Sequence, residues 1–269
     1  IATALRGDVD LYGVYGEAKA QLRGEDISIT NSSLGNTIAN AGDDIDITNT
    51  YVRGDVIANA GDDITVDNLT TASTRRFFGW HSTGNDGNAR LTAKGDITVS
   101  GSDIAGKLDA ESTETLTRTH SGFSTTRGNV SVDGTTVGGE ITATADEITI
   151  SDSSARRLNL LAKADSTTTY NNHGDSNYVY GHDHGHYGQT TKSQEGGNIT
   201  LTSVRETGFG GSTLTADNNI SINDTGLKFA RANAGNNINL TDSRLEYSLA
   251  TAGQDINIAN SGFVNSYAR

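Results

Sequence analysis

Three histidines at alternate positions are the residues of this sequence best suited to bind a metal ion. His182, His184 and His186 lie in the segment GHDHGHYG, residues 181–188. In a β-strand, alternate side chains point to one face, so the three imidazoles would lie together. Imidazole nitrogens are ligands for Zn²⁺, Cu²⁺ and Ni²⁺, which makes such a site chemically feasible. A polar loop without a metal is the simpler interpretation, because the glycines loosen the strand and no group that would orient the imidazoles can be named.

Two pairs of neighbouring aspartates could instead bind calcium. Asp43 and Asp44 form one pair, and Asp62 and Asp63 form the other. Carboxylates stacked at the corners of successive repeats can hold Ca²⁺. However, the calcium-binding repeat GGxGxDxUx does not occur, and asparagine replaces aspartate in several later copies of the same segment. We therefore expect these residues to act mainly as turn formers.

Aromatic and arginine side chains gather in three segments whose flanks are rich in serine and threonine. We place these segments near residues 73–90, 111–127 and 165–196, and glycine or asparagine in their centres predicts β-hairpin arms. Aromatic residues with arginine are typical of interface hot spots, and aromatic faces also stack on sugar rings. The candidate binding residues are Arg75, Arg76, Phe77, Phe78, Trp80, Phe123, Tyr178, Tyr180 and Tyr187. The alternative is that these polar insertions are tolerated decoration.

A short pattern that repeats eleven times must position these segments. In each copy a small residue or glycine precedes an acidic residue or asparagine, and two aliphatic residues follow one position apart, as in AGDDIDI and GNNINL. The first aliphatic residues are Val9, Ile27, Ile45, Ile64, Ile97, Val130, Ile148, Ile199, Ile220, Ile238 and Ile256. Most copies are 18 or 19 residues apart, and longer spacings of 33, 33 and 51 residues mark the three insertions.

The alternation within each copy predicts short strands joined by tight turns. One repeat cannot bury its own apolar face, whereas stacked repeats can. The sequence therefore predicts an all-β protein with a single rod over residues 1–269. The rod is a single-stranded parallel β-helix, or β-solenoid, of about 11 coils with three hairpin-like insertions. Isoleucine, valine and leucine should form inward ladders, and stacked asparagines, such as Asn236 above Asn218, should form hydrogen-bonded ladders.

The composition excludes several classes of protein. Lysine and arginine number 20 against 33 aspartates and glutamates, so the formal net charge is −13 and a nucleic-acid partner is disfavoured. The chain has no cysteine, which excludes disulfides, thiol catalysis and cysteine-bound metals. It also has no methionine, so we expect a processed product or a segment of a longer protein. No transmembrane segment or signal peptide is recognisable.

Two segments resemble the haemagglutinin repeats of filamentous haemagglutinin-type proteins, which leave the cell by two-partner secretion: AGDDIDITNTYVRGDVIANAGDDITV and ARANAGNNINLTDSRLEYSLATAGQDINI. The resemblance extends over nearly the whole chain. It implies a right-handed β-helix, export through an outer-membrane transporter, and an extracellular or bacterial cell-surface location. The secretion domain of that family is not recognisable, so the resemblance covers the shaft alone and implies no catalytic residues.

The expected function is that of a non-enzymatic, exported shaft of an adhesin or toxin-delivery stick. It would present its arms to a cell-surface carbohydrate, a protein receptor or neighbouring copies of itself. If the arms leave from a common corner, their aromatic residues will form one patch. One alternative is an extracellular filament or matrix protein built by stacking of solenoids. A polysaccharide-cleaving β-helix enzyme is disfavoured because the aspartate pairs fall in repeat turns rather than forming a catalytic carboxylate pair.

Overall fold

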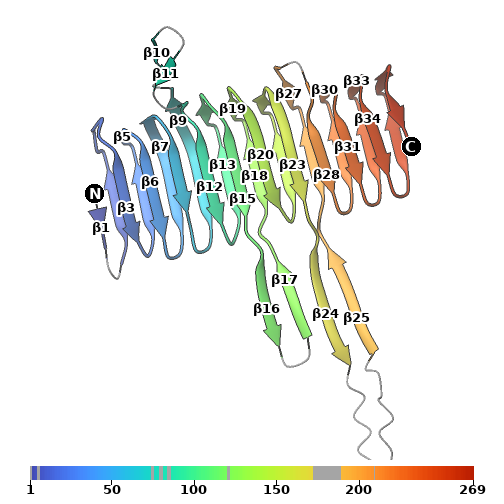
Figure 1. Ribbon diagram of the computed structural model, residues 1–269, viewed down its shortest axis with the longest axis horizontal. Coiled ribbons are helices and arrows are strands. Elements are labelled where there is room, and N and C mark those ends of the chain that lie inside the picture. The colour runs from blue at the N-terminus through green and yellow to red at the C-terminus, as the bar shows by residue number, and fades with distance from the viewer. Residues whose placement is uncertain are drawn as a thin grey trace, which may run out of the picture.

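The fold is an all-β solenoid in which successive coils stack side by side along a rod (Figure 1). The computed structural model describes residues 2–4, 7–73, 76–78, 81–83, 86–119, 122–171, 189–208 and 210–269. For residues 2–3, 76–78, 81–83, 119, 122, 168–171 and 189–192 it describes the backbone alone. The residues that the structure describes contain no helix of the length and apolarity needed to cross a bilayer.

Each coil begins with a strand that carries the repeated aliphatic pair. These first strands are β2 (Val9–Tyr12), β4 (Ile27–Thr30), β7 (Ile45–Arg53), β9 (Ile64–Ala72), β13 (Ile97–Ser100), β18 (Val130–Asp133), β21 (Ile148–Ser151), β26 (Ile199–Thr202), β29 (Ile220–Asn223), β32 (Ile238–Thr241) and β35 (Ile256–Ala259). They pair in parallel, and every predicted first aliphatic residue lies beside its counterpart in the next coil. The predicted eleven-coil ladder is therefore confirmed.

Two further strands complete a coil. The second strands are β5 (Ser33–Leu34), β14 (Asp103–Ile104), β19 (Thr136–Val137), β22 (Ser154–Ala155), β27 (Arg205–Glu206), β30 (Gly226–Lys228), β33 (Arg244–Glu246) and β36 (Gly262–Val264), while β7 and β9 continue through this position. The third strands form a 12-stranded parallel sheet of β1 (Ala2–Thr3), β3 (Ala20–Gly24), β6 (Thr37–Ala41), β8 (Val56–Asn59), β12 (Ala89–Ala93), β15 (Leu108–Ser112), β20 (Glu140–Ala145), β23 (Arg157–Ala162), β28 (Thr213–Ala216), β31 (Arg231–Ala234), β34 (Leu249–Ala252) and β37 (Tyr267–Ala268).

The core is a thin column of stacked aliphatic side chains. Ile45 and Ile64 are adjacent, as are Ile47 and Val66, and each of these side chains is at most 1% exposed. Ala58 of the third strand is fully buried in the same cluster. Because alternate side chains of each strand point inward, a few aliphatic residues per coil fill the interior. This explains how a chain that is only 33% hydrophobic can fold.

Three corners join the strands of a coil. The first corner lies between the first and second strands, the second corner between the second and third strands, and the third corner between the third strand and the next coil. In all eleven coils the residue four positions after the first aliphatic residue makes the first corner with φ between 45° and 63°. Only glycine, asparagine, aspartate and one serine, Ser203, occupy it. Glycine, asparagine and aspartate enter the left-handed region at low cost.

Three antiparallel hairpins interrupt the coils. The first is β10 (Arg76–Phe78) with β11 (His81–Thr83), the second is β16 (Thr115–Thr119) with β17 (Gly122–Thr126), and the third is β24 (Asp165–Asn171) with β25 (Gln189–Glu195). The first hairpin lies between β9 and β12, and hence at the second corner. From the sequence we place its end near residue 90, and β12, which pairs within the rod, starts at Ala89.

Candidate binding site

The second and third hairpins merge into one sheet that stands off the rod. Both leave from the third corner, and β17 pairs with β24 to give the order β16-β17-β24-β25. We call these four strands the lateral sheet; Figure 1 shows it below the rod, with β10 and β11 at the opposite edge. The two hairpins leave two coils apart, and a two-stranded hairpin is itself two strand spacings of about 4.8 Å wide. The hairpins therefore meet edge to edge without adjusting the rod.

Charged groups fix the base of the lateral sheet. The guanidinium of Arg127, which is 13% exposed, pairs with the carboxylate of Glu114. The backbone N–H of Arg127 donates to Asp165 Oδ1 (2.8 Å), and that of Gly197 donates to Asp146 Oδ1 (2.8 Å). Burial raises the pKa of Asp146, and the charge of Asp165 adds to this shift. Burial also raises the pKa of Asp165, against the opposing effect of the Arg127 amide and charge.

The pairing assigns the side chains of the lateral sheet to two different faces. Leu116 lies opposite Thr125, and Arg118 lies opposite Phe123, so these four share one face. The side chain of Leu116 is 49% exposed. The other face carries hydroxyl groups from the described residues Thr115, Thr117, Ser124, Thr126, Thr167 and Ser193. One face thus carries the apolar and cationic side chains together with the hydroxyls of Thr125 and Ser166, and the other face carries the remaining hydroxyl groups.

The sequence-predicted binding residues divide between two corners. Phe123 belongs to the lateral sheet, whereas Arg76, Phe77 and Phe78 belong to β10 at the second corner. The condition for one common patch is thus met by the second and third insertions and not by the first. The segment ARLTAKGD, which starts at Ala89, could be either the strand of the coil or the returning strand of the hairpin, and this hid the corner of the first insertion from sequence reasoning. Arg75, Trp80, Tyr178, Tyr180, Tyr187, His182, His184 and His186 lie outside the described residues.

The aspartate pairs take part in the turns of the third corner. The backbone N–H of Asp63 donates to Asp44 Oδ1 (3.0 Å), and that of Asp96 donates to Asp63 Oδ1 (2.6 Å). Asparagine fills the same role in later coils, where the N–H of Asn237 donates to Asn219 Oδ1 (3.1 Å). Both side chains present an acceptor oxygen to the next coil, so aspartate and asparagine can replace each other here. The predicted amide ladder is confirmed as well, since Asn236 Nδ2 donates to Asn218 Oδ1 (2.8 Å).

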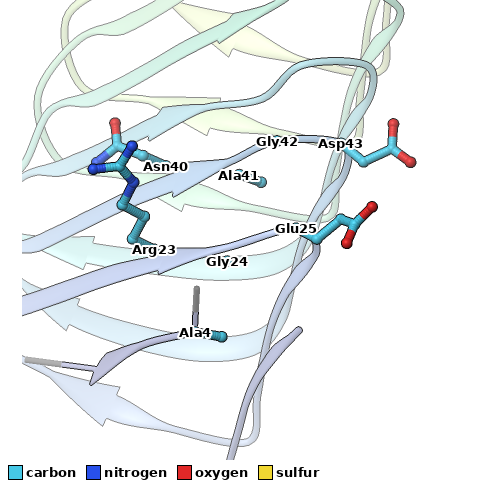
Figure 2. A pocket seen from close by; sticks show the side chains of 8 residues that line it. All are labelled: Ala4, Arg23, Gly24, Glu25, Asn40, Ala41, Gly42 and Asp43. Carbon is cyan, nitrogen blue, oxygen red and sulfur yellow. The ribbon is translucent and has the colours of Figure 1, made fainter. Parts of the chain in front are cut away.

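The neighbouring carboxylates remain exposed. Asp43, Asp44 and Asp62 bring carboxylate oxygens within 4.8 Å of one another. Asp43 also borders an open hollow of about 890 Å³ near the first coils. Figure 2 shows Arg23 and Asn40 on one side of this hollow, and Glu25 and Asp43 on the other. The turn hydrogen bonds account for Asp44, and no buried ligand geometry distinguishes this cluster from an ordinary acidic surface.

The second corner carries two adjoining hollows that sequence reasoning missed. One, of about 660 Å³, lies over coils five to eight and is lined by Lys107, Glu140, Arg156 and Arg157 together with Thr207, Gly208 and Gly210. The other, of about 420 Å³, lies over coils nine to eleven and is lined by Phe229, Arg231, Tyr247 and Tyr267 among others. A shared offset of nine residues after Ile220 and Ile238 places Phe229 and Tyr247 at equivalent positions, and this was the available signal.

The fold and these surfaces define the protein as a β-solenoid with lateral insertions. Comparison with family models, with curated proteins and with solved structures finds no match.

Proposed function

We propose that this protein is a non-enzymatic, exported rod of the filamentous haemagglutinin type, which acts as the shaft of an adhesin or toxin-delivery stick. The lateral sheet is its presentation surface. Its partner is a cell-surface carbohydrate, a protein receptor or another copy of the chain. The proposal places the protein on the bacterial cell surface after passage through an outer-membrane transporter.

The pairing of β17 with β24 is the observation that carries this proposal. The second and third insertions leave the rod two coils apart and form one four-stranded sheet, with charged contacts at its base. Independent surface decoration would not require the two hairpins to share strand hydrogen bonds. The rod supplies rigidity, because every coil is hydrogen-bonded to its neighbours, and functional residues commonly lie on segments held by such scaffolds.

The test removes the lateral sheet and leaves the rod intact. Deleting residues 165–196 takes 32 of the 51 residues between Ile148 and Ile199 and leaves 19, which is the spacing between Ile45 and Ile64. Deleting residues 113–127 leaves 18 residues between Ile97 and Val130, a spacing used elsewhere in the rod. Making both deletions together avoids exposing β17 as an unpaired edge. We expect the double deletion to keep its β-sheet circular dichroism and to lose binding to host-cell surfaces.

A matched control removes the first hairpin instead. Deleting residues 73–87 leaves 18 residues between Ile64 and Ile97 and should leave lateral-sheet binding intact. Full adhesion by the double deletion would overturn the role of the lateral sheet. Fractionation of the source organism tests the second part of the proposal, because a protein confined to the cytosol would contradict both export and adhesion.

A further inference from the structure

The two hollows of the second corner lie on the turns of neighbouring coils along the rod, and we treat them together as one track. The turn of coil eight lines the first hollow, and the turn of coil nine lines the second. These turns are in contact, since the Gly211 N–H donates to the Lys228 carbonyl oxygen (2.9 Å). From Lys107 to Tyr267 the track crosses seven coils, or about 29 Å at about 4.8 Å per step. We call it the second-corner groove.

The second-corner groove is cationic on a strongly acidic protein. Its described charged lining residues are Lys107, Arg156, Arg157, Arg231 and Glu140, a formal charge of +3. Glu140 is only 12% exposed and is already paired with Arg157 (2.8 Å) and Lys107 (3.7 Å). Within the described part of the chain, Arg156 and Arg231 have no carboxylate at salt-bridge distance. The protein as a whole carries −13, and the groove attracts anions locally because its own lining charge is positive.

Two aromatic residues of the groove occupy backbone positions that favour small residues. Phe229 has φ of 51° and Tyr247 has φ of 50°. The left-handed region costs bulky side chains about 1–2 kcal/mol per residue, and Asn265 fills the equivalent position of the next coil at lower cost. The two rings stack with centroids 5.2 Å apart, and the side chains remain 54% and 53% exposed. Strained positions that persist on a surface point to a binding role.

We propose that the second-corner groove binds a linear acidic polysaccharide, with uronic-acid carboxylates on the arginines and sugar rings against the aromatic residues. A single nucleic-acid strand carries one phosphate per about 3.4 Å, hence about eight charges over the groove. These phosphates, about eight in number, exceed the lining charge of +3. A uronic-acid chain carries at most one carboxylate per ring and offers C–H faces to the exposed rings of Phe229, Tyr247 and Tyr267. The net charge of −13 also opposes a second copy of the rod as occupant.

The test measures binding of alginate oligosaccharides by calorimetry at two salt concentrations. We expect binding that weakens with salt and falls at least about tenfold in the double variant Phe229→Asn and Tyr247→Asn. Asn265 shows that this backbone position accepts asparagine, so the variant should fold. The double variant Arg156→Gln and Arg231→Gln should weaken binding to a similar extent. Deletion of the lateral sheet should leave alginate binding unchanged, which separates this proposal from the proposed function.

Matched controls use an aromatic residue and a cation outside the groove. Tyr12→Asn removes a ring that is 75% exposed on β2, and Arg90→Gln removes a cation from β12. Both variants should bind alginate as the unmodified protein does. Undiminished binding by the Phe229 and Tyr247 double variant would overturn the site. Equal binding of neutral malto-oligosaccharides would overturn the role of charge, and equal binding of an oligothymidylate of the same length would overturn the assignment to polysaccharide.

Discussion

The substitution Gly61→Ala tests how closely neighbouring coils approach each other at the third corner. A Cβ atom added there would lie 1.8 Å from the carbonyl oxygen of Gly42 and 2.7 Å from its carbonyl carbon. Side-chain carbons essentially never approach below 3.0 Å, so Gly61→Ala must push the two turns apart by more than an ångström. Close approach, and not a positive φ, is therefore the reason for glycine at this position.

The cost of Gly61→Ala follows from the contacts beside it. The N–H of Asp62 donates to the Asp43 carbonyl oxygen (3.0 Å), and the N–H of Asp63 donates to Asp44 Oδ1 (3.0 Å). Losing two such hydrogen bonds, at about 1 kcal/mol each, adds to an overpacking cost of about 1–3 kcal/mol. We expect the free energy of unfolding to fall by about 3–5 kcal/mol.

Urea unfolding followed by circular dichroism measures this change, with hydrogen exchange at the Asp62 and Asp63 amides as a local readout. Gly226→Ala is the matched control, because a Cβ atom at Gly226 meets nothing within 4 Å. The control should leave stability unchanged or raise it by about 0.4–1 kcal/mol. If Gly61→Ala were no more destabilising than Gly226→Ala, the close stacking of the third corner would be refuted.

Two further predictions concern the core and the base of the lateral sheet. Ile97→Asp buries a carboxyl group where Ile97 is 0% exposed, and it should lower the free energy of unfolding by about 5–10 kcal/mol. Its control, Thr98→Asp, lies on the exposed face of the same strand and should lower it by about 0.5 kcal/mol or less. Thermal unfolding measures both changes. The raised pKa values of Asp146 and Asp165 mean that the folded state binds protons more tightly than the unfolded state. The two ionised carboxylates therefore destabilise the folded state at neutral pH, and this destabilisation is relieved as the pH falls toward about 4 and they bind protons. The melting temperature of the unmodified protein should rise relative to that of Asp146→Asn over this range, and a constant difference would contradict the assignment.

The rod could be predicted from the sequence because stacking requires only that the same pattern of inward-pointing residues recurs in each coil. Ile64 follows Ile45 by 19 residues and Ile97 follows Ile64 by 33 residues, yet all three lie in one ladder. The extra residues leave the coil at a corner, where they do not disturb the strands. Periodicity therefore predicted the ladder and the Asn236–Asn218 bond, and it made a common patch of the insertions conditional on a shared corner.

The candidate site was less accessible to sequence reasoning for physical reasons. The segment after Asn88 alternates like either a rod strand or a returning hairpin strand, so the corner of the first insertion stayed ambiguous. Phe229 and Tyr247 were overlooked because bulky residues are poor candidates for left-handed turns. Arg156 and Glu140 are 16 positions apart in sequence and come together only when coils stack. Grooves along a solenoid are formed between repeats, and a single repeat does not reveal them.

The lateral sheet depends on the number of coils between its two hairpins. Duplicating coil six, residues 130–147, would move the hairpins apart by one further coil step of about 4.8 Å. The strands β17 and β24 would then be too far apart to pair. Because the chain has no cysteine, the change can be read by cross-linking.

Ser124 on β17 lies directly opposite Thr167 on β24, and directly paired residues have Cα atoms about 4.5–5.5 Å apart, within the range of a disulfide. Ser124→Cys with Thr167→Cys should form a disulfide in the unmodified rod and not in the duplicated one. Thr117→Cys with Ser124→Cys, a pair within one hairpin, should form it in both. A disulfide between Cys-substituted positions 124 and 167 in the duplicated rod would show that the hairpins pair through their own flexibility, and that coil spacing does not determine the surface the rod presents.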